Sequence, residues 1–286
     1  MQKEKKRVFP CFYATSLVIL VFLISYCIDG NVAFEHKGED IKRGEEKAIK
    51  DNKGVEQGSQ VSSVEAFEQL PDFGSINDVK ERKHEFFEFM YPIIEMENAK
   101  VLKKRERLLV LYEKQHNNLD QSPEDLKWID GLVSLYKIKK KQEEYKWEVL
   151  LRRVDIVPVQ LALIQSAKET GWGTSRFARV GNNMFGQWCF SELRGIVPKQ
   201  RGSDANHRVA TFKTVKDSVR SYIHNINTSD AYTRLRHLRF EQRQAGEVPD
   251  SYALANGLLR YSERREDYVK EVQAMILHNK PLMDSL

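Results

Sequence analysis

One carboxyl group in the chain lies where its surroundings can shift its pKa. Glu169 stands in the segment 167–173, AKETGWG, at the predicted end of a helix that Pro158 begins. The negative end of the helix dipole disfavours an ionised carboxyl group, and the nearby Trp172 could withdraw it from water. Both effects raise a pKa, and a protonated carboxylic acid can donate the proton that glycoside cleavage requires. From these residues alone, a surface glutamate beside a helix cap is an equally good interpretation.

A second cluster, GNNMFG, follows at 181–186. Asn182 and Asn183 tolerate left-handed backbone geometry, and Gly186 permits a tight turn. Asparagine amides can also bind the hydroxyl and acetamido groups of sugars, and Phe185 would lie on the same surface. Taken alone, this cluster is more typical of a structural turn.

Other candidate site residues flank these two segments. Trp188 could stack on a sugar ring, although a buried tryptophan is the commoner case. An inverting glycosidase needs a second carboxylate to activate water, and Glu192, in a loop-like stretch, is preferred over Asp204 and Asp217.

Two tyrosines near the C-terminus could also serve the site. Ser262 is the predicted N-cap of a helix, so Tyr261 lies at its start and Tyr268 in its second turn. A phenol could orient water or an acetamido group. Packing on the helix is the favoured interpretation for Tyr268.

Several classes of function receive no support. The seven histidines and three cysteines do not fall at metal-ligand spacing, and no glycine-rich phosphate loop appears, so we expect neither a metal nor a cofactor. The formal charge of +5 does not indicate a nucleic-acid partner. From residue 151 onward the chain holds 21 basic and 14 acidic side chains, an excess that could attract an anionic polymer but is equally typical of a solvated surface.

The elements that position these residues are predicted to be mostly helical. Apolar spacing indicates helices through 77–150, with a start at Ser122-Pro123 and a bend or break at Pro92. We expect this region to pack on the remainder of the chain. Beyond it, the pattern predicts helices at 158–170, 215–225, 251–260 and 263–278, with a strand at 208–212.

The N-terminus has the pattern of an export signal. A basic stretch ending at Arg7 precedes the uncharged apolar run 8–28, which is long enough to cross a bilayer as a helix. The bulky Tyr26 and the lack of a small-residue cleavage site favour an uncleaved anchor over a cleaved signal. We therefore divide the chain into an anchor or signal (1–29), a polar linker (30–75), a helical region (76–150) and a C-terminal domain (151–286).

Taken together and in this order, the motifs resemble a known family. The segments 169–175, 181–186, 261–262 and 268–269 resemble the glucosaminidases of glycoside hydrolase family 73, and in particular its Bax-type bacterial proteins. The segments 195–198, 225–228 and 231–236 are also similar to that subgroup. The resemblance covers roughly residues 150–280.

The resemblance implies a lysozyme-like α+β fold with a small β lobe. It implies cleavage of peptidoglycan after N-acetylglucosamine, with Glu169 as catalytic acid, Tyr261 as active-site tyrosine and Tyr268 in reserve. The glycan strands would be the partner, and the enzyme would act in the periplasm, held in the inner membrane by residues 8–28. The turn at 181–186 would line the substrate groove.

Two departures from the family leave its second catalytic group open. No acid aligns cleanly between residues 186 and 212, and Gln187 follows the Phe-Gly pair where a basic residue is usual. Substrate assistance by the acetamido group would need no second acid. A lytic transglycosylase and a non-catalytic peptidoglycan-binding protein stay as alternatives.

Overall fold

The structure of this protein is a computed structural model that describes residues 70–139, 146–189 and 208–286. These residues belong to one compact unit. The predicted membrane segment, most of the predicted linker and the candidate acids Glu192 and Asp204 lie outside the described residues. Within the described ranges, no helix combines the length and the apolar character that crossing a bilayer requires.

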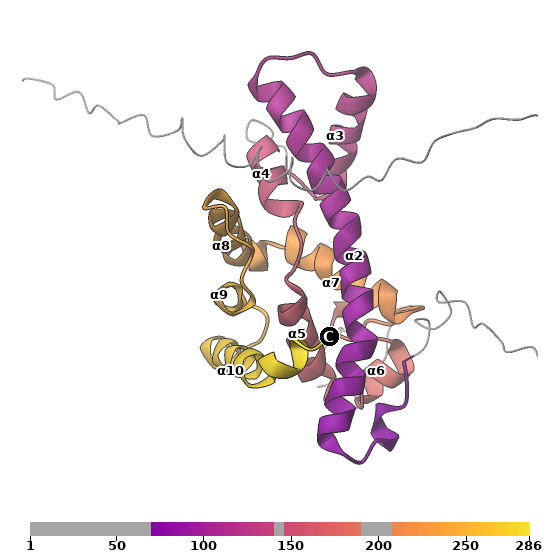
Figure 1. Cartoon of the computed structure of the whole chain (residues 1–286). Coiled ribbons are helices and arrows are strands. Elements are labelled where there is room, and N and C mark those ends of the chain that lie inside the picture. The colour runs from indigo at the N-terminus through magenta and orange to yellow at the C-terminus, as the bar shows by residue number, and fades with distance from the viewer. Residues whose placement is uncertain (1–69, 140–145, 190–207) are drawn as a thin grey trace, which may run out of the picture. The chain divides into compact units, whose positions relative to one another are not determined.

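The longest element is α2 (Val79–His116), which runs the length of the described body (Figure 1). It follows the short 3-10 helix η2 (Phe73–Ser75), and Asp78 caps it by accepting a hydrogen bond from the backbone N–H of Glu81 at 2.7 Å. The sequence predicted a bend or a break at Pro92; a break is excluded, because α2 continues through this residue. Buried side chains surround the proline on the same helix, and their packing offsets the lost backbone hydrogen bond: Phe86, Phe87, Met90, Ile93 and Ile94.

Two shorter helices complete the N-terminal region. The predicted start of α3 (Pro123–Leu135) is confirmed, since Ser122 Oγ accepts from the backbone N–H of Asp125 at 3.1 Å. Helix α4 (Lys146–Arg153) spans residue 150, where the sequence suggested a domain boundary. As expected, this region packs on the rest of the chain, because α2 contacts both α5 and α7.

Helix α5 (Val159–Thr170) is the central element and carries Glu169. Its predicted start and end are confirmed: Pro158 precedes it, and Gly171 ends it in the left-handed region with φ of 56°. Every residue from 161 to 167 is buried, because α2, α9 and α10 pack around the helix. A helix that is enclosed on all sides holds its last turn in a fixed position.

A short helix and a small hairpin follow α5. Helix α6 (Arg176–Gly181), which the sequence did not suggest, leads to strand β1 (Trp188–Cys189). This strand pairs antiparallel with β2 (Arg208–Val209), with Trp188 opposite Val209. The predicted strand at 208–212 therefore has two strand residues, and the mostly helical fold class is confirmed for the described residues.

The remaining helices are α7 (Val215–Thr228), the 3-10 helix η4 (Asp230–Tyr232), α8 (Thr233–Gln244), α9 (Ser251–Ala255) and α10 (Glu266–Met283). In Figure 1, α8, α9 and α10 lie in sequence along the side opposite α2. The prediction of Ser262 as a helix N-cap is wrong, because α10 begins only after Arg265. Helix α9 ends at Ala255, before the predicted Arg260. Just beyond it, Gly257 packs so closely on α8 that a Cβ there would lie 2.3 Å from the Leu235 Cα.

A buried ionic network ties the N-terminal region to α8. The Asp155 carboxylate lies 3.4 Å from Arg105 of α2 and accepts hydrogen bonds from Arg243 at 3.0 and 3.1 Å. Arg239, which is fully buried, donates to the backbone carbonyl of Arg152 and to Asn227 Oδ1 at 2.9 and 2.7 Å. This network explains why the sequence pattern missed α8, whose buried face includes arginines in place of an apolar stripe.

Candidate active site

A polar cavity of about 1000 Å³ lies beside the end of α5. This volume is at the upper end of the range of about 300–1,000 Å³ for ligand sites. Its walls come from the end of α5, the turn after α6, α7, and the segment that leads into α10. Residues on these walls include Glu169, Phe185, Gly186, Trp188, Tyr261 and Glu263.

Glu169 is held in this cavity by a chain of buried hydrogen bonds. Tyr268 Oη donates to Glu169 Oε1 at 2.9 Å, and Gln165 Nε2 donates to the same phenol oxygen at 3.1 Å. Tyr222 Oη in turn donates to Gln165 Oε1 at 2.6 Å. Because Gln165 occupies the acceptor side of Tyr268, the phenol proton points at the glutamate. Sequence reasoning missed Gln165 and Tyr222, which carry no signal beyond their helical spacing.

Burial makes Glu169 a weaker acid than an ordinary glutamate. Withdrawal from water raises the pKa of this carboxyl group, and the opposing effects of the Tyr268 hydrogen bond and the Lys168 charge are smaller. The Lys168 ammonium is itself paired with Glu271. The arrangement favours a carboxyl group that keeps its proton at higher pH, as the sequence suggested.

Tyrosines form much of the surroundings of this acid. Tyr261 stacks on Tyr268 with ring centroids 5.2 Å apart, and its hydroxyl donates to the Phe185 carbonyl at 2.8 Å. Burial raises the pKa of Tyr261 well above its usual value, and that of Tyr232 to about 12. These phenols therefore stay neutral near pH 7. Tyr261 lines the cavity, whereas Tyr268 is 2% exposed and reaches Glu169 from behind it.

The two asparagines of the GNNMFG segment hold the turn itself. Asn182 adopts φ of 49° and donates to the Phe212 and Lys213 carbonyls at 3.2 and 3.1 Å. Asn183 donates to the Gln187 and Ala210 carbonyls, while its oxygen accepts from the backbone of Gln187. Neither residue lines the cavity, so the structure favours the structural interpretation over the predicted substrate contact.

The two tryptophans nearest Glu169 in the sequence occupy different surroundings. Trp172 packs edge-on against Phe86 and Phe87 of α2, with ring centroids 5.9 and 5.2 Å away. Trp172 was also a candidate for substrate contact from the sequence, and it is not among the residues that line this cavity. Trp188 does line the cavity from β1 and is 53% exposed, as a sugar-stacking residue requires.

The predicted second carboxylate, Glu192, lies outside the described residues. Asp217 does not line this cavity, and it pairs with Arg220 at 3.0 Å. The structure instead places the exposed Glu263 on the wall of the cavity. Sequence reasoning passed over this residue because it stands in a charged run, where a single acid carries no distinguishing pattern.

The absence of a side chain at Gly186 leaves space for the Glu169 carboxyl group, and a substitution at Gly186 can test whether this space matters. A Cβ at residue 186 would lie 3.2 Å from Glu169 Oε2, and the glycine has φ of 61°. We expect Gly186→Ala to destabilise the fold by about 1–2 kcal/mol through backbone strain and to lower kcat by about tenfold or more by displacing the acid. Steady-state assays and chemical denaturation would measure the two effects.

Gly246→Ala is the matched control, because Gly246 has φ of 76° and a Cβ there would have no neighbour within 4 Å. It should lose comparable stability and keep its activity. Equal losses of activity in the two variants would contradict a specific role for the space beside Glu169.

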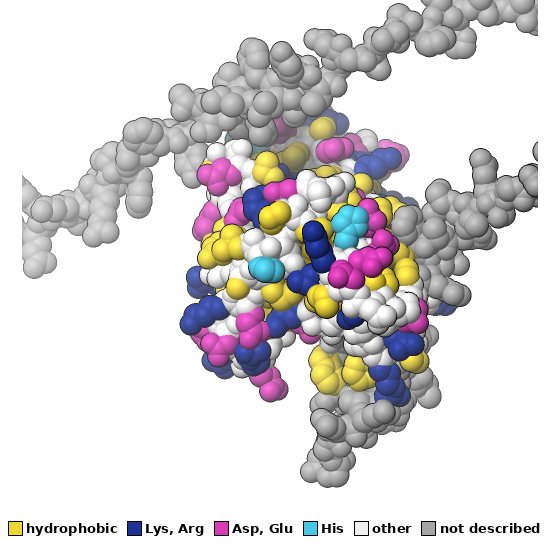
Figure 2. All heavy atoms as spheres, turned by 60° about the horizontal axis from the view of Figure 1, so that its bottom comes forward, with side chains coloured by type: hydrophobic (Ala, Val, Ile, Leu, Met, Phe, Trp, Pro, Cys, Tyr) yellow, Lys and Arg dark blue, Asp and Glu magenta, His cyan; other side chains and the backbone are white. Residues whose placement is uncertain are grey.

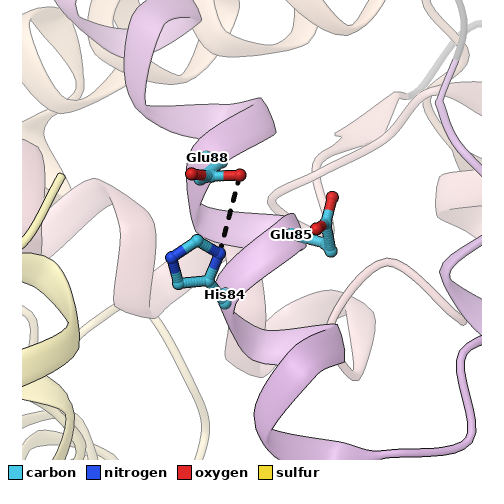
Figure 3. Close-up of side chains that lie close together, drawn as sticks. All are labelled: His84, Glu85 and Glu88. Atoms are coloured by element: carbon cyan, nitrogen blue, oxygen red, sulfur yellow. Dashed lines mark ion pairs between the residues drawn. The ribbon is translucent and has the colours of Figure 1, made fainter.

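One group of side chains on α2 has the composition of a cation site. His84, Glu85 and Glu88 place ligand atoms within 4.8 Å of one another, and His84 lies 3.5 Å from Glu88 (Figure 3). All three project from little more than one turn of a single helix, and both acids are exposed. Because His84 already pairs with Glu88 on an exposed helix surface, we interpret the group as surface ion pairing. Mixed surface charge of this kind is also visible in Figure 2, where basic and acidic side chains lie side by side.

Comparison with known proteins shows to which family the chain belongs. Residues 145–281 match the family model Glucosaminidase, described as mannosyl-glycoprotein endo-beta-N-acetylglucosaminidase. The chain is also 31% identical over 233 residues to Protein bax of Escherichia coli (strain K12), covering 78% of this chain and 82% of that protein. The chain belongs to the glucosaminidase family. No solved structure gives a significant match.

The family match confirms the predicted resemblance to glucosaminidases and the lysozyme-like, mostly helical fold. The similarity to Protein bax confirms the Bax-type subgroup. It also makes the protein a glycosidase-type enzyme. The matched segment of the glucosaminidase family begins at residue 145, so α2 and α3 lie outside it although α2 packs directly on α5.

Proposed function

We propose that this protein is an exported endo-β-N-acetylglucosaminidase that hydrolyses peptidoglycan glycan strands after N-acetylglucosamine. The observation that carries the proposal is the Glu169 carboxyl group, which has a raised pKa, faces a large polar cavity and is oriented by Tyr268. A protonated, fixed acid in a groove is the essential component of glycoside cleavage. Membership in the glucosaminidase family supports the same reaction class.

In the proposed reaction, Glu169 gives its proton to the glycosidic oxygen as the bond from that oxygen to the sugar C1 breaks. The acetamido oxygen of the same sugar bonds to C1 and bears the developing positive charge. The Glu169 carboxylate then takes a proton from water, whose oxygen attacks C1 and displaces the acetamido group. The product carries a reducing N-acetylglucosamine end, and Glu169 recovers its proton.

The substrate contacts of this proposal use residues on the cavity wall. Trp188 would stack on a sugar ring, while Phe185 and Gly186 shape the wall nearest Glu169. Tyr261 would line the cavity beside the reacting sugar. If water needed a separate base, Glu263 and Glu192 would be the candidates; substrate assistance requires neither.

Export is part of the proposal, because the substrate lies outside the cytoplasm. The basic residues before the apolar run 8–28 would stay inside, which places the rest of the chain in the periplasm. Labelling with a membrane-impermeant reagent, before and after the outer membrane is permeabilised, would test this location. Labelling only after cell lysis would contradict it.

Removal of the Tyr268 hydroxyl should change the pH dependence of the reaction in a defined direction. The acid must be protonated, so activity is present below the Glu169 pKa and lost as pH rises through it. The Tyr268 hydrogen bond lowers that pKa, so Tyr268→Phe should raise it and move the basic limb of the kcat/KM profile to higher pH. A basic limb that stays in place or moves to lower pH would argue against Glu169 as the acid.

The experiment that tests the proposed function directly is digestion of purified peptidoglycan, with release of soluble glycan fragments as the readout. Fragments released by wild type and absent with Glu169→Gln would support a glycosidase with this acid. Binding to the polymer without release by either protein would favour the alternative of a non-catalytic binding protein.

A further inference from the structure

A second cavity, of about 400 Å³, adjoins the one that holds Glu169. Ser221 and His224 of α7 line both cavities and separate them. The opposite wall of the second cavity comes from α2 and from the end of α3. The N-terminal helical region, which precedes the segment matched by the family, therefore extends the site beyond the catalytic cavity.

The walls of this extension carry more positive than negative charge. Its basic residues are Lys100, Lys104 and Arg220, and its acids are Glu97 and Asp217. Lys137, in the left-handed region with φ of 54°, adds a further ammonium group on the adjoining wall of the main cavity.

The acids of the extension are already satisfied by neighbouring cations. Glu97, which is 3% exposed, accepts from Lys100 at 2.6 Å and from Arg220 at 3.0 Å, and Arg220 also pairs with Asp217. Two ammonium groups on these walls, those of Lys104 and Lys137, have no ion-pair partner in the described part of the chain. They are the charges left available to an anionic ligand.

His224, which lies between the two cavities, can form hydrogen bonds to a polar ligand that extends from one cavity into the other. His224 is half-buried, and its ring lies against Tyr136 with centroids 6.2 Å apart. Burial lowers the pKa of His224, and the nearby Lys137 charge lowers it further. The imidazole is therefore neutral near pH 7 and can exchange hydrogen bonds without adding charge.

We propose that Lys104 in this second cavity and Lys137 on the adjoining wall of the main cavity bind a carboxylate of the peptide attached to the glycan strand. The inference rests on the proposed function, since a glycan bound at Glu169 presents its peptide substituents to neighbouring walls. A free carboxylate is a monovalent anion that a lysine ammonium binds as a point charge. The helical region before residue 145 would thus supply substrate selectivity that the catalytic domain alone lacks.

The test compares two polymers from one preparation: peptidoglycan with its peptides, and the same glycan stripped of them by an amidase. Wild type should cleave the peptide-bearing polymer with the higher kcat/KM. Lys104→Ala combined with Lys137→Ala should lower kcat/KM on the peptide-bearing polymer by about fivefold to tenfold, as expected for two partly exposed charge pairs. The kcat/KM on stripped glycan should stay within about twofold of the wild-type value. Added salt should shrink the wild-type preference in the same way.

Lys103→Ala combined with Lys127→Ala is the matched control, because both lysines are exposed and line neither cavity. It removes the same charge and should retain the wild-type preference. The inference would be overturned if the control variant lost as much kcat/KM on the peptide-bearing polymer as the test variant. It would also be overturned if the test variant lost kcat/KM equally on both polymers.

Co-sedimentation separates this inference from the proposed function. In a Glu169→Gln background, binding to peptide-bearing glycan should weaken about fivefold or more when Lys104 and Lys137 are replaced. If the protein with Glu169 intact cleaved neither polymer while this selective binding was still observed, the proposed reaction would be refuted and the peptide site would be supported. Cleavage of both polymers without peptide-dependent binding or preference would do the reverse.

Discussion

Glu169→Gln should lower kcat/KM on peptidoglycan by about a hundredfold to ten-thousandfold, the range expected for loss of a general acid. The amide keeps nearly the same shape, and its oxygen can still accept the hydrogen bond from Tyr268. It has no acidic proton to give the leaving oxygen. Because burial disfavours the charged carboxylate, the variant should unfold at the same or a higher denaturant concentration.

The comparison needs a variant that changes the same functional group elsewhere. Glu241→Gln on α8 serves, because Glu241 is exposed and does not line the cavity. Its activity and stability should both match wild type. If Glu169→Gln kept more than about a tenth of wild-type activity, another residue would have to supply the proton.

The largest loss of stability should follow removal of the Asp155 carboxylate. Asp155→Ala leaves Arg105 and Arg239 buried without their counter-charge, and breaking such a pair costs about 3–5 kcal/mol. Denaturant titration at pH 7 measures this loss. The exposed Asp130 of α3 is the control position, and Asp130→Ala should change the free energy of unfolding by less than about 0.5 kcal/mol.

The same network predicts how stability depends on pH. Burial alone would raise the pKa of Asp155, but the Arg239 charge, the Arg243 hydrogen bond and the Arg105 charge together hold it below its usual value. This stabilisation is present above the unfolded-state pKa, about 3.9, and is lost as pH falls through the lower folded-state pKa. Asp155→Ala should therefore be less stable than wild type at pH 7, with a difference that narrows in acid. If the difference in unfolding free energy between wild type and Asp155→Ala stayed constant from pH 7 to acid, it would contradict a lowered pKa for Asp155.

The central helix of the fold and its acid could be predicted because their signals are local. Pro158 begins α5 and Gly171 ends it, and both act through backbone geometry within a few residues. The raised pKa of Glu169 was also predicted, although its cause was only half right. Burial within the cavity wall produces it, whereas the proposed neighbour Trp172 packs against Phe86 and Phe87 of α2.

What the sequence could not show depends on partners far away along the chain. Helix α8 was missed because it buries arginines against backbone carbonyls and Asp155, which a hydrophobic period does not register. The same limit applies to Tyr268 and Asn183, whose residue types suit sugar contacts as well as internal hydrogen bonds. Only their positions decide between the two uses: Tyr268 orients Glu169, and Asn183 ties the turn to Gln187 and Ala210.

Hydrolysis after N-acetylglucosamine can be checked directly from the chemistry of the cut ends. Purified peptidoglycan would be digested with the protein, and the released fragments analysed by mass spectrometry before and after borohydride reduction. Hydrolysis at this bond should produce reducing N-acetylglucosamine ends, which gain two hydrogens on reduction and are absent after digestion with Glu169→Gln. Anhydro-muramyl ends, which borohydride leaves unchanged, would contradict it and identify a lytic transglycosylase instead.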